Sequence, residues 1–308
     1  MYIKLFELGY KPYIVTTNHK NVNISFINTT TNIINIKNYS DIKESDFDIL
    51  VVNSDQTWRK WDQYFYDCGF LKFAQNWNKL KFVYGASLGF DFWSFNRKDE
   101  EIIGKLIRNF SEISVREKGS IELIQNHFGI KPKLVLDPTL IINKNYYLKL
   151  IKDYRSNINE TTNYIFVYKI SHSNKTMHSF IQKAKEILNY TIYNYRMDNK
   201  SLVEDFIYHI KKSKAVITNS FHCTIFSIIF KKPFITFNFK SNGFERIKSL
   251  SELLGFKNRI VETDEEFQKI SLLTIIPKIN YKILNKQRVE SLNYISRNLK
   301  LFKKIKVF

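Results

Sequence analysis

Cysteine, proline and glycine are all scarce in this chain of 308 residues, which contains two cysteines, five prolines and nine glycines. Cys68 and Cys223 alone cannot form a disulfide framework or a zinc site made of cysteines. The few prolines and glycines exclude collagen-like, linker-like and low-complexity chains. So few cysteines fit a protein of the reducing cytoplasm.

Long apolar runs are also missing, since no stretch reaches the roughly 20 apolar residues that cross a bilayer. The first seven residues carry charges, unlike the apolar region of a signal peptide. Acidic residues are few as well, because 29 Asp and Glu stand against 48 Lys and Arg, which gives a net charge of +19. We predict a cytoplasmic protein with a strongly basic surface.

Apolar residues are nevertheless abundant, at 44% of the chain with 16% aromatic residues, and this excludes global disorder. The basic charge suits nucleic acid, an anionic membrane or a small anionic substrate, or it only solvates the surface. The tail, residues 297–308 (RNLKLFKKIKVF), mixes basic and apolar residues. It predicts either a helix lying on an anionic membrane or a helix packed on the body with its lysines in water.

Short apolar runs alternate with longer segments of helical periodicity, a pattern typical of βαβ units with parallel sheets. The predicted strands are residues 12–16, 47–53, 80–86, 112–115, 133–136, 164–170, 191–195, 215–218 and 234–239. The predicted helices are residues 99–110, 118–127, 175–188, 202–212, 221–230, 246–254, 264–272 and 285–304. A length near twice 150 residues and the polar stretch 152–163 predict two doubly wound, Rossmann-like domains, residues 1–155 and 156–308.

Ligands of such sheets bind beyond the carboxyl ends of the strands, so the residues that follow each strand deserve notice. Asp55, Gln56 and Trp58 follow the strand 47–53. A carboxylate, an amide and a large aromatic ring suit recognition of hydroxyls and stacking on a sugar. Alternatively, these residues form a turn, with Trp58 in the core.

Arg116 and Glu117 follow the strand 112–115. The guanidinium of Arg116 would grip a carboxylate or a phosphate with two hydrogen bonds. The alternative is a surface pair between the two residues, which would contribute little to stability.

Asn219, Ser220 and His222 stand between a short apolar strand and an apolar helix. Ser220 can cap that helix, and His222 lies in its first turn, where the helix dipole attracts anions. Lys240, after the strand 234–239, would bring a cation to the same place or is one of many surface lysines. The motifs of metalloproteases, P-loops and dinucleotide-binding proteins are missing from the sequence, and we predict no metal and no cofactor.

Several strings, taken together and in order, resemble the polysaccharide pyruvyl transferase family. They are residues 47–58 (FDILVVNSDQTW), 84–89 (YGASLG), 113–117 (ISVRE), 135–139 (VLDPT), 216–230 (VITNSFHCTIFSIIF), 232–235 (KPFI) and 246–250 (RIKSL). The resemblance implies a GT-B-like fold, with two Rossmann-like domains facing a cleft. It also implies transfer of pyruvate from phosphoenolpyruvate to a sugar of a cell-surface polysaccharide or of its lipid-linked precursor, as a ketal.

The resemblance further implies that Arg116 binds the donor, that His222 is catalytic or contacts the donor, and that Lys240 is the donor lysine. The N-terminal turn of the helix 221–230, with Asn219 and Ser220, completes the predicted donor site. On this hypothesis, His222 transfers a proton or contacts the leaving phosphate.

The predicted acceptor site lies after the strand 47–53. Asp55 or Glu117 would accept the hydroxyl proton, while Gln56 and Trp58 would bind the acceptor sugar. The predicted partners are phosphoenolpyruvate and a glycan acceptor, free or lipid-linked, with peripheral membrane contact through the basic tail at the inner face. Nucleic acid is not a predicted partner.

Two departures from the family pattern are visible. Cys223 follows the histidine where the family commonly has glycine, so its side chain could crowd an incoming phosphate. The first ten residues resemble the end of a helix, so we expect the N-terminal domain to lack its first strand and loop. The alternatives to an active transferase are an inactive member that binds glycans or polyanions, and a GT-B glycosyltransferase that uses a nucleotide sugar.

Overall fold

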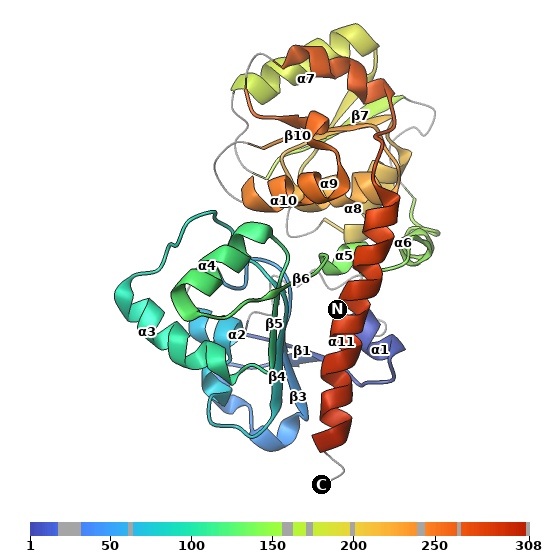
Figure 1. Ribbon diagram of the computed structural model, residues 1–308. Helices are drawn as coiled ribbons and strands as arrows, with labels where there is room; N and C mark the ends of the chain where they lie inside the picture. Colours follow the sequence, from blue (N-terminus) through green and yellow to red (C-terminus); the bar gives the residue numbers. More distant parts are fainter. Residues whose placement is uncertain are drawn as a thin grey trace.

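The computed structural model describes residues 1–17, 32–60, 64–155, 163–170, 175–197, 201–238, 244–263 and 266–305. All strand pairs in these residues are parallel, and the strands form three sheets. This confirms the predicted parallel α/β organisation. Figure 1 shows the sheet of the second half of the chain above that of the first half, with a long C-terminal helix that begins below the upper sheet and runs down beside the lower one.

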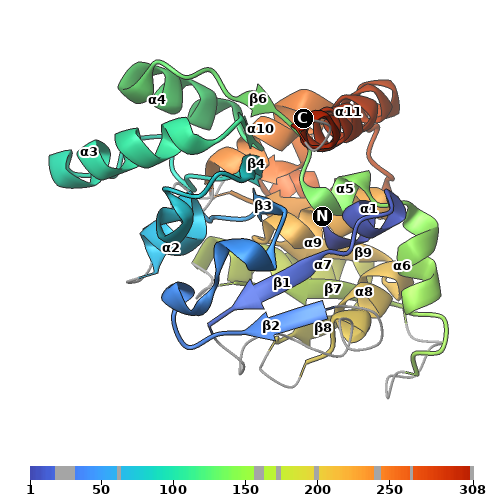
Figure 2. The ribbon, with the colours of Figure 1, turned by 90° about the horizontal axis from the view of Figure 1, so that it is seen from below.

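The first half of the chain contains a pair of strands and a four-stranded sheet in the order β3-β4-β5-β6. Its strands are β1 (Tyr13–Thr16), β2 (Asn32–Asn35), β3 (Ile49–Val52), β4 (Leu80–Ala86), β5 (Glu112–Val115) and β6 (Lys133–Leu134). Its helices are α1 (Tyr2–Glu7), α2 (Phe65–Phe70), α3 (Arg97–Leu106), α4 (Lys118–Phe128), α5 (Pro138–Ile141) and α6 (Lys144–Leu150). Figure 2 shows the β1-β2 pair beside β3.

Every residue of β4 is buried, because the sheet is covered on both faces. Apolar residues of α3 and α4, such as Ile103 and Ile124, pack on one face. Phe82 and Tyr84 on the other face pack against Tyr294 of the last helix. Apart from Lys81 near its start, β4 is thus apolar on both faces and lies at the centre of a three-layer arrangement.

The second half contains a five-stranded sheet in the order β11-β10-β9-β7-β8. Its strands are β7 (Tyr164–Tyr168), β8 (Thr191–Tyr195), β9 (Ala215–Thr218), β10 (Phe234–Phe237) and β11 (Ile260–Val261). Its helices are α7 (Lys175–Leu188), α8 (Val203–Lys212), α9 (Phe221–Ile229), α10 (Phe244–Leu254) and α11 (Tyr281–Ile305). The order reverses between β7 and β9, so α9 begins at the switch point where doubly wound sheets bind ligands.

Short 3₁₀ helices connect several of these elements. They are η1 (Tyr39–Asp41), η2 (Glu44–Asp46), η3 (Lys72–Ala74), η4 (Ile107–Asn109), η5 (Lys257–Arg259) and η6 (Phe267–Thr274). The α-helix predicted for residues 264–272 was wrong in type, because the described part of that segment folds as η6. The predicted domain boundary stays a prediction, because residues 156–162 lie outside the described part.

Helix α11 returns from the second half of the chain to the sheet of the first. The Tyr294 hydroxyl donates a hydrogen bond of 2.7 Å to the carbonyl oxygen of Val83, and the Ser291 hydroxyl accepts one of 2.9 Å from the Leu136 amide. Leu299 is buried further along the helix. Up to residue 300, the basic tail thus packs on the body, which is the second of the two predicted arrangements.

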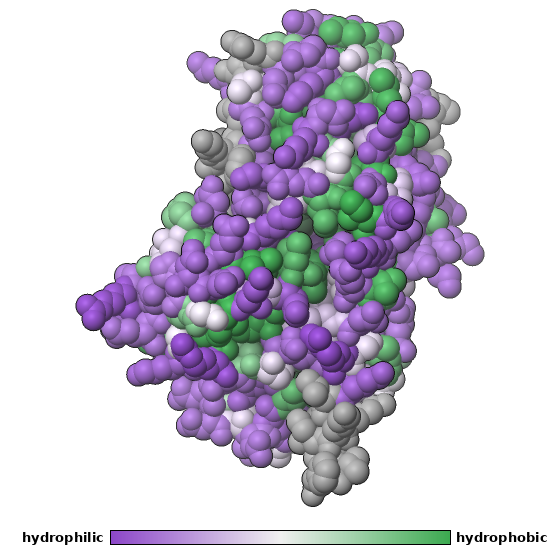
Figure 3. Space-filling model, viewed as in Figure 1, coloured by the Kyte–Doolittle hydropathy of each residue, from purple (hydrophilic) through white to green (hydrophobic). Residues whose placement is uncertain are grey.

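Hydrophilic side chains cover most of the face shown in Figure 3, with apolar patches between them. Among the described residues, no helix is both long and apolar enough to cross a membrane.

Candidate functional site

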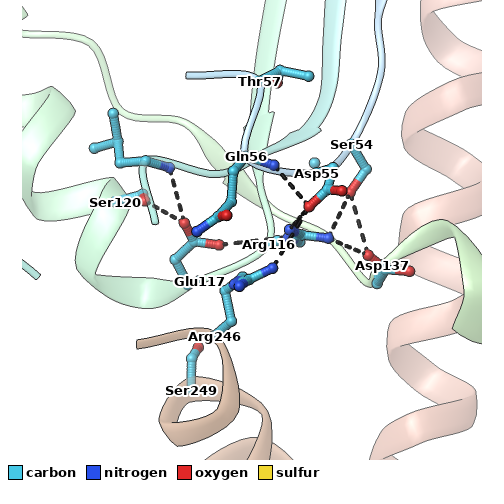
Figure 4. A network of polar contacts seen from close by, with 12 residues as sticks. Ser54, Asp55, Gln56, Thr57, Arg116, Glu117, Ser120, Asp137, Arg246 and Ser249 are labelled. Atoms are coloured by element: carbon cyan, nitrogen blue, oxygen red, sulfur yellow. Dashed lines mark hydrogen bonds and ion pairs between the residues drawn. The ribbon is translucent and has the colours of Figure 1, made fainter. Parts of the chain in front are cut away.

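Polar side chains from both halves of the chain meet beyond the carboxyl ends of the strands. Figure 4 shows Asp55 from the loop after β3, Arg116 from the end of β5, Asp137 from the segment after β6 and Arg246 from α10. His222, in the first turn of α9, reaches the same place from the second half. The strand-end residues predicted as a site therefore do gather, and they lie between the two sheets.

Arg116 is the centre of this group. Its side chain is 1% exposed, and it forms ion pairs with Asp137 at 2.5 Å, with Asp55 at 2.8 Å and with Glu117 at 3.9 Å. It also donates a hydrogen bond of 3.4 Å to the hydroxyl of Ser54. A buried guanidinium held by three carboxylates is a fixed positive charge, and its N–H groups are directed toward the protein's own carboxylates.

The ionisation of the carboxylates follows from these contacts. Burial opposes ionisation of Asp137, but its contacts with His222, Arg116 and the amide of Thr139 hold the pKa of its carboxyl group well below the ordinary value. Burial by itself would raise the pKa of the Asp55 carboxyl group. The nearby charges of Arg116, His222 and Arg246 outweigh burial, so the pKa of Asp55 lies below its ordinary value. Both groups are therefore carboxylates at neutral pH.

The backbone at Asp55 is unusual, with φ of +97°, a region that non-glycine residues rarely adopt. The amide of Ser87 holds this conformation by donating a hydrogen bond of 3.0 Å to the Asp55 carbonyl oxygen. Strain of this kind persists only where surrounding structure enforces it, and it is concentrated at functional sites. Here the unusual backbone conformation directs the Asp55 carboxylate toward Arg116 and Arg246.

Arg246 is the second of these arginines. Its Nη1 atom lies 3.6 Å from Oδ1 of Asp55, and its guanidinium lies 5.3 Å from the ring of Phe221, which Arg116 also contacts at 5.0 Å. Burial and the nearby Arg116 lower the pKa of Arg246. In the described structure, Arg246 has looser ion pairing than Arg116, which makes it the better candidate to meet an anionic ligand.

His222 stands at the start of α9, where Ser220 caps the helix by accepting a hydrogen bond of 3.3 Å from the Cys223 amide. The Nε2 atom of His222 lies 3.8 Å from Oδ2 of Asp137, and its side chain is 41% exposed. An imidazole that is open to solvent on one side and faces a buried carboxylate on the other can exchange protons with a ligand.

Buried polar atoms without a hydrogen bond concentrate at this place. Five of the eight side chains with such an atom in the described structure belong to it, namely Gln56, Ser87, Arg116, Glu117 and Arg246. Buried polar groups normally have partners, and exceptions call for a reason. Water or a polar ligand bound at this site would give these atoms hydrogen-bond partners.

Comparison with known proteins identifies the chain. The family model of polysaccharide pyruvyl transferases matches residues 3–241. The chain belongs to this family. No curated protein is significantly similar to it.

Solved structures confirm the predicted GT-B-like fold of this family member. The UDP-GlcNAc 2-epimerase from Methanocaldococcus jannaschii is similar with a TM-score of 0.60 and 14% identity, over 94% of this chain and 91% of the epimerase. A candidate UDP-N-acetylglucosamine 2-epimerase from Listeria monocytogenes is similar with a TM-score of 0.53 and 13% identity, over 90% and 81% of the two chains. At these identities the likeness concerns the fold alone.

Two site predictions for this family member need correction. Trp58 is buried in the core, where its Nε1 donates a hydrogen bond of 2.6 Å to the Gly69 carbonyl oxygen and its ring stacks on Phe70. It is therefore not available to stack on a sugar. Glu117 is fully buried, and its Oε1 accepts hydrogen bonds from the amide of Leu88 and the hydroxyl of Ser120, so it positions Arg116 and does not meet a substrate.

The residues predicted to bind the donor differ in where they lie and what they contact. Asn219 accepts a hydrogen bond of 2.9 Å from the Ile170 amide, and Ser220 is occupied as a helix cap, so both shape the start of α9. Lys240 lies outside the described residues. Cys223 is buried in the core, where burial raises the pKa of its thiol to about 12, and it does not crowd the start of the helix.

Asp137 is missing from the sequence prediction, because the proline that follows it is typical of a structural turn. Arg246 is not assigned a role of its own, although it follows Lys240 in a segment that could bring one or two cations to the same place. The signal that could have found both is their place in the family strings at residues 135–139 and 246–250. Among the described residues, no group of His, Cys, Asp and Glu is arranged to hold a metal ion.

Proposed function

We propose that this protein transfers pyruvate from phosphoenolpyruvate to two hydroxyls of a sugar in a cell-surface polysaccharide or its lipid-linked precursor, at the inner face of the membrane. One observation carries the proposal, in a member of the pyruvyl transferase family. Arg246 contacts Asp55, His222 at the start of α9 faces Asp137, and Arg116 joins these two carboxylates. We propose that neither a metal nor a cofactor takes part.

The donor would bind where the Asp55 carboxylate now lies. Oδ1 of Asp55 is 2.8 Å from Nη2 of Arg116 and 3.6 Å from Nη1 of Arg246, as the carboxylate of a bound donor would be. The backbone of Asp55 is fixed and its side chain is exposed, so rotation of the side chain would free Nη2 of Arg116 and Nη1 of Arg246. Asp55 thus holds the place of the donor anion until the donor arrives.

The reaction itself needs two proton transfers. The methylene carbon of phosphoenolpyruvate takes up a proton while one sugar hydroxyl attacks the central carbon. The second hydroxyl then displaces phosphate from that carbon, its proton leaves with the phosphate, and a ketal remains. The two hydroxyl protons thus balance the new methyl group and the released phosphate.

We propose that His222 moves these protons, because its side chain is 41% exposed and lies in the first turn of α9. Asp137 faces its Nε2 atom at 3.8 Å and would orient the ring. The positive end of the helix dipole and Arg246 would stabilise the leaving phosphate. Following the family resemblance, Lys240 would add a further cation for the donor.

On the acceptor side, Gln56 is the remaining candidate of the two residues predicted there. Its Nε2 atom is buried without a hydrogen bond beside Gly89, in the loop region that also carries Asp55. The Asp55 carboxylate, once displaced from the arginines, could accept a hydrogen bond from an acceptor hydroxyl. Its lowered pKa makes it a weak base, so orientation of the hydroxyl is its main contribution.

Phosphate release from phosphoenolpyruvate with glycan acceptors tests this function. We expect release that depends on both substrates and falls by about a hundredfold or more in His222→Ala. Polyanion binding that weakens steeply with salt, without phosphate release, would instead support an inactive binding member. Turnover of a nucleotide sugar by the same preparation would support the glycosyltransferase alternative.

A further inference from the structure

A cavity away from the site above lies at the C-terminal end of α10. It has a volume of about 550 Å³. Its lining combines cations with apolar residues and includes one carboxylate, Glu252. The cations are Arg259, Lys257 and Lys278, and the apolar residues are Leu272, Ile275 and Ile276.

Arg259 is the unusual member of this lining. It is 3% exposed, and in the described residues its side chain donates a hydrogen bond to the Leu272 carbonyl oxygen and forms no ion pair with a carboxylate. Its Nε atom is buried without a hydrogen-bond partner. Burial lowers the pKa of this guanidinium, and no carboxylate offsets the effect.

A guanidinium has five N–H donors, so Arg259 keeps most of its donor capacity unused. Buried charges are normally paired, because an unpaired one loses its hydration without compensation. Lys278 adds another positive charge to the lining, while Lys257 pairs with Glu252 at 3.2 Å. The cavity therefore has an excess of positive charge around a buried, unpaired cation.

The apolar part of the lining is exposed. Ile275 and Ile276 are 53% and 57% exposed, and they are neighbours in the segment between η6 and α11. Two adjacent isoleucines in water, beside a cavity lined with cations, match an amphiphile that carries an anionic head and an apolar chain.

We propose that this cavity binds the phosphate headgroup of an anionic phospholipid while Ile275 and Ile276 enter the membrane surface. The charge complementarity between a chain of net charge +19 and an anionic leaflet favours this partner over a second copy of the same basic chain. The contact would hold the protein at a membrane surface independently of the donor site and of the proposed transfer reaction.

Sedimentation with vesicles of phosphatidylglycerol and phosphatidylcholine tests the proposal, with pure phosphatidylcholine vesicles as the reference. We expect binding to the anionic vesicles, and a loss of at least about tenfold in the double variant Ile275→Ser/Ile276→Ser and in Lys278→Glu. Arg259→Gln should weaken binding as well. Circular dichroism shows which variants are folded. If Arg259→Gln does not fold, the exposed substitutions Ile275→Ser, Ile276→Ser and Lys278→Glu still test the proposal.

A matched control is available on α7, where Ile187 is 61% exposed and Lys185 is exposed. The double variant Lys185→Glu/Ile187→Ser changes the same kinds of side chain away from the cavity and should bind as the wild type does. Equal losses in control and test variants, or no binding to anionic vesicles, would overturn the proposal. So would binding of inorganic phosphate without vesicle binding, or a change from dimer to monomer in Ile275→Ser/Ile276→Ser.

Discussion

Single carboxylates decide how the cations of the candidate site are held. Asp137 contacts both Arg116 and His222, and its Oδ1 also caps α5 through the amide of Thr139. A neutral side chain of the same size would keep the shape and remove the charge. The consequences differ for stability and for catalysis, so the two can be measured separately.

The substitution Asp137→Asn should lower the free energy of unfolding at pH 7 by about 3 kcal/mol, because it breaks a buried ion pair. The native pKa of Asp137 lies well below its ordinary value of 3.8, so its stabilisation is complete above that value and is lost as the pH falls through the native pKa. Urea unfolding at several pH values should therefore show a difference from wild type that shrinks in acid. A difference that is constant with pH would contradict the ion pair.

Asp137→Asn should also slow turnover, because Asp137 faces Nε2 of His222 at 3.8 Å and would orient the ring. We expect kcat per folded molecule to fall by about tenfold, measured by steady-state kinetics. A purely structural role would lower the amount of active protein and leave kcat per folded molecule unchanged.

Asp55→Asn tests the proposal that this carboxylate holds the place of the donor. Loss of its charge should lower the KM for phosphoenolpyruvate, because the donor no longer competes with it for Arg116 and Arg246. If Asp55 were instead the essential base, kcat would fall by about a hundredfold and KM would change little. Steady-state kinetics with varied donor separates the two results.

Trp58→Phe tests the position of the indole ring in the core. It removes the hydrogen bond to Gly69 and part of the ring volume, so we expect a loss of about 2 kcal/mol in the free energy of unfolding. The KM for the acceptor should stay unchanged. A rise in that KM with unchanged stability would restore the predicted stacking role.

At the scale of elements, the sequence predicts the order and type of most strands and helices correctly. Strands such as β3 consist of apolar residues, and the apolar residues of helices such as α7 recur with the period of an α-helix, so local pattern and final structure agree. The segment after residue 266 misled the prediction because its 3₁₀ helix shares the apolar spacing of an α-helix. In short segments, the local sequence pattern therefore predicts that a helix is present better than it predicts whether the helix is an α-helix or a 3₁₀ helix.

Contacts between elements are harder to predict. Nothing in the sequence of α11 indicates that Ser291 meets the amide of Leu136, or that Tyr294 meets Val83, since each pair lies more than 150 residues apart. The meeting of Arg116 with Asp137 could be anticipated, because the strands before them are neighbours. Its pairing with Asp55 depends on a strained backbone that no pattern reveals.

The return of α11 to the first half gives a prediction at this scale. Ser291→Ala leaves the buried amide of Leu136 without an acceptor and should lower the free energy of unfolding by about 2 kcal/mol. Val289→Ala on the exposed side of the same helix is the control and should have little effect. Equal effects of the two substitutions in thermal unfolding would show that α11 does not pack as described.

At the scale of the whole molecule, the two halves matter because the candidate site needs both. Asp55, Arg116 and Asp137 come from the first half, and His222 and Arg246 come from the second. The net charge of +19 is mostly unrelated to this site, where carboxylates neutralise the arginines. The length and alternation of elements predict the architecture, while the site depends on how the halves meet.

Transfer of the labelled carbon is the most direct test of the proposed reaction. Phosphoenolpyruvate labelled with carbon-13 at its central carbon is incubated with the protein and a glycan acceptor, and the acceptor is examined by nuclear magnetic resonance. We predict a labelled ketal carbon on the acceptor with the wild type, and about a hundredfold less with His222→Ala. If the label stays in phosphoenolpyruvate when the wild-type protein is given acceptors that bind to the protein, the proposed transfer reaction is contradicted.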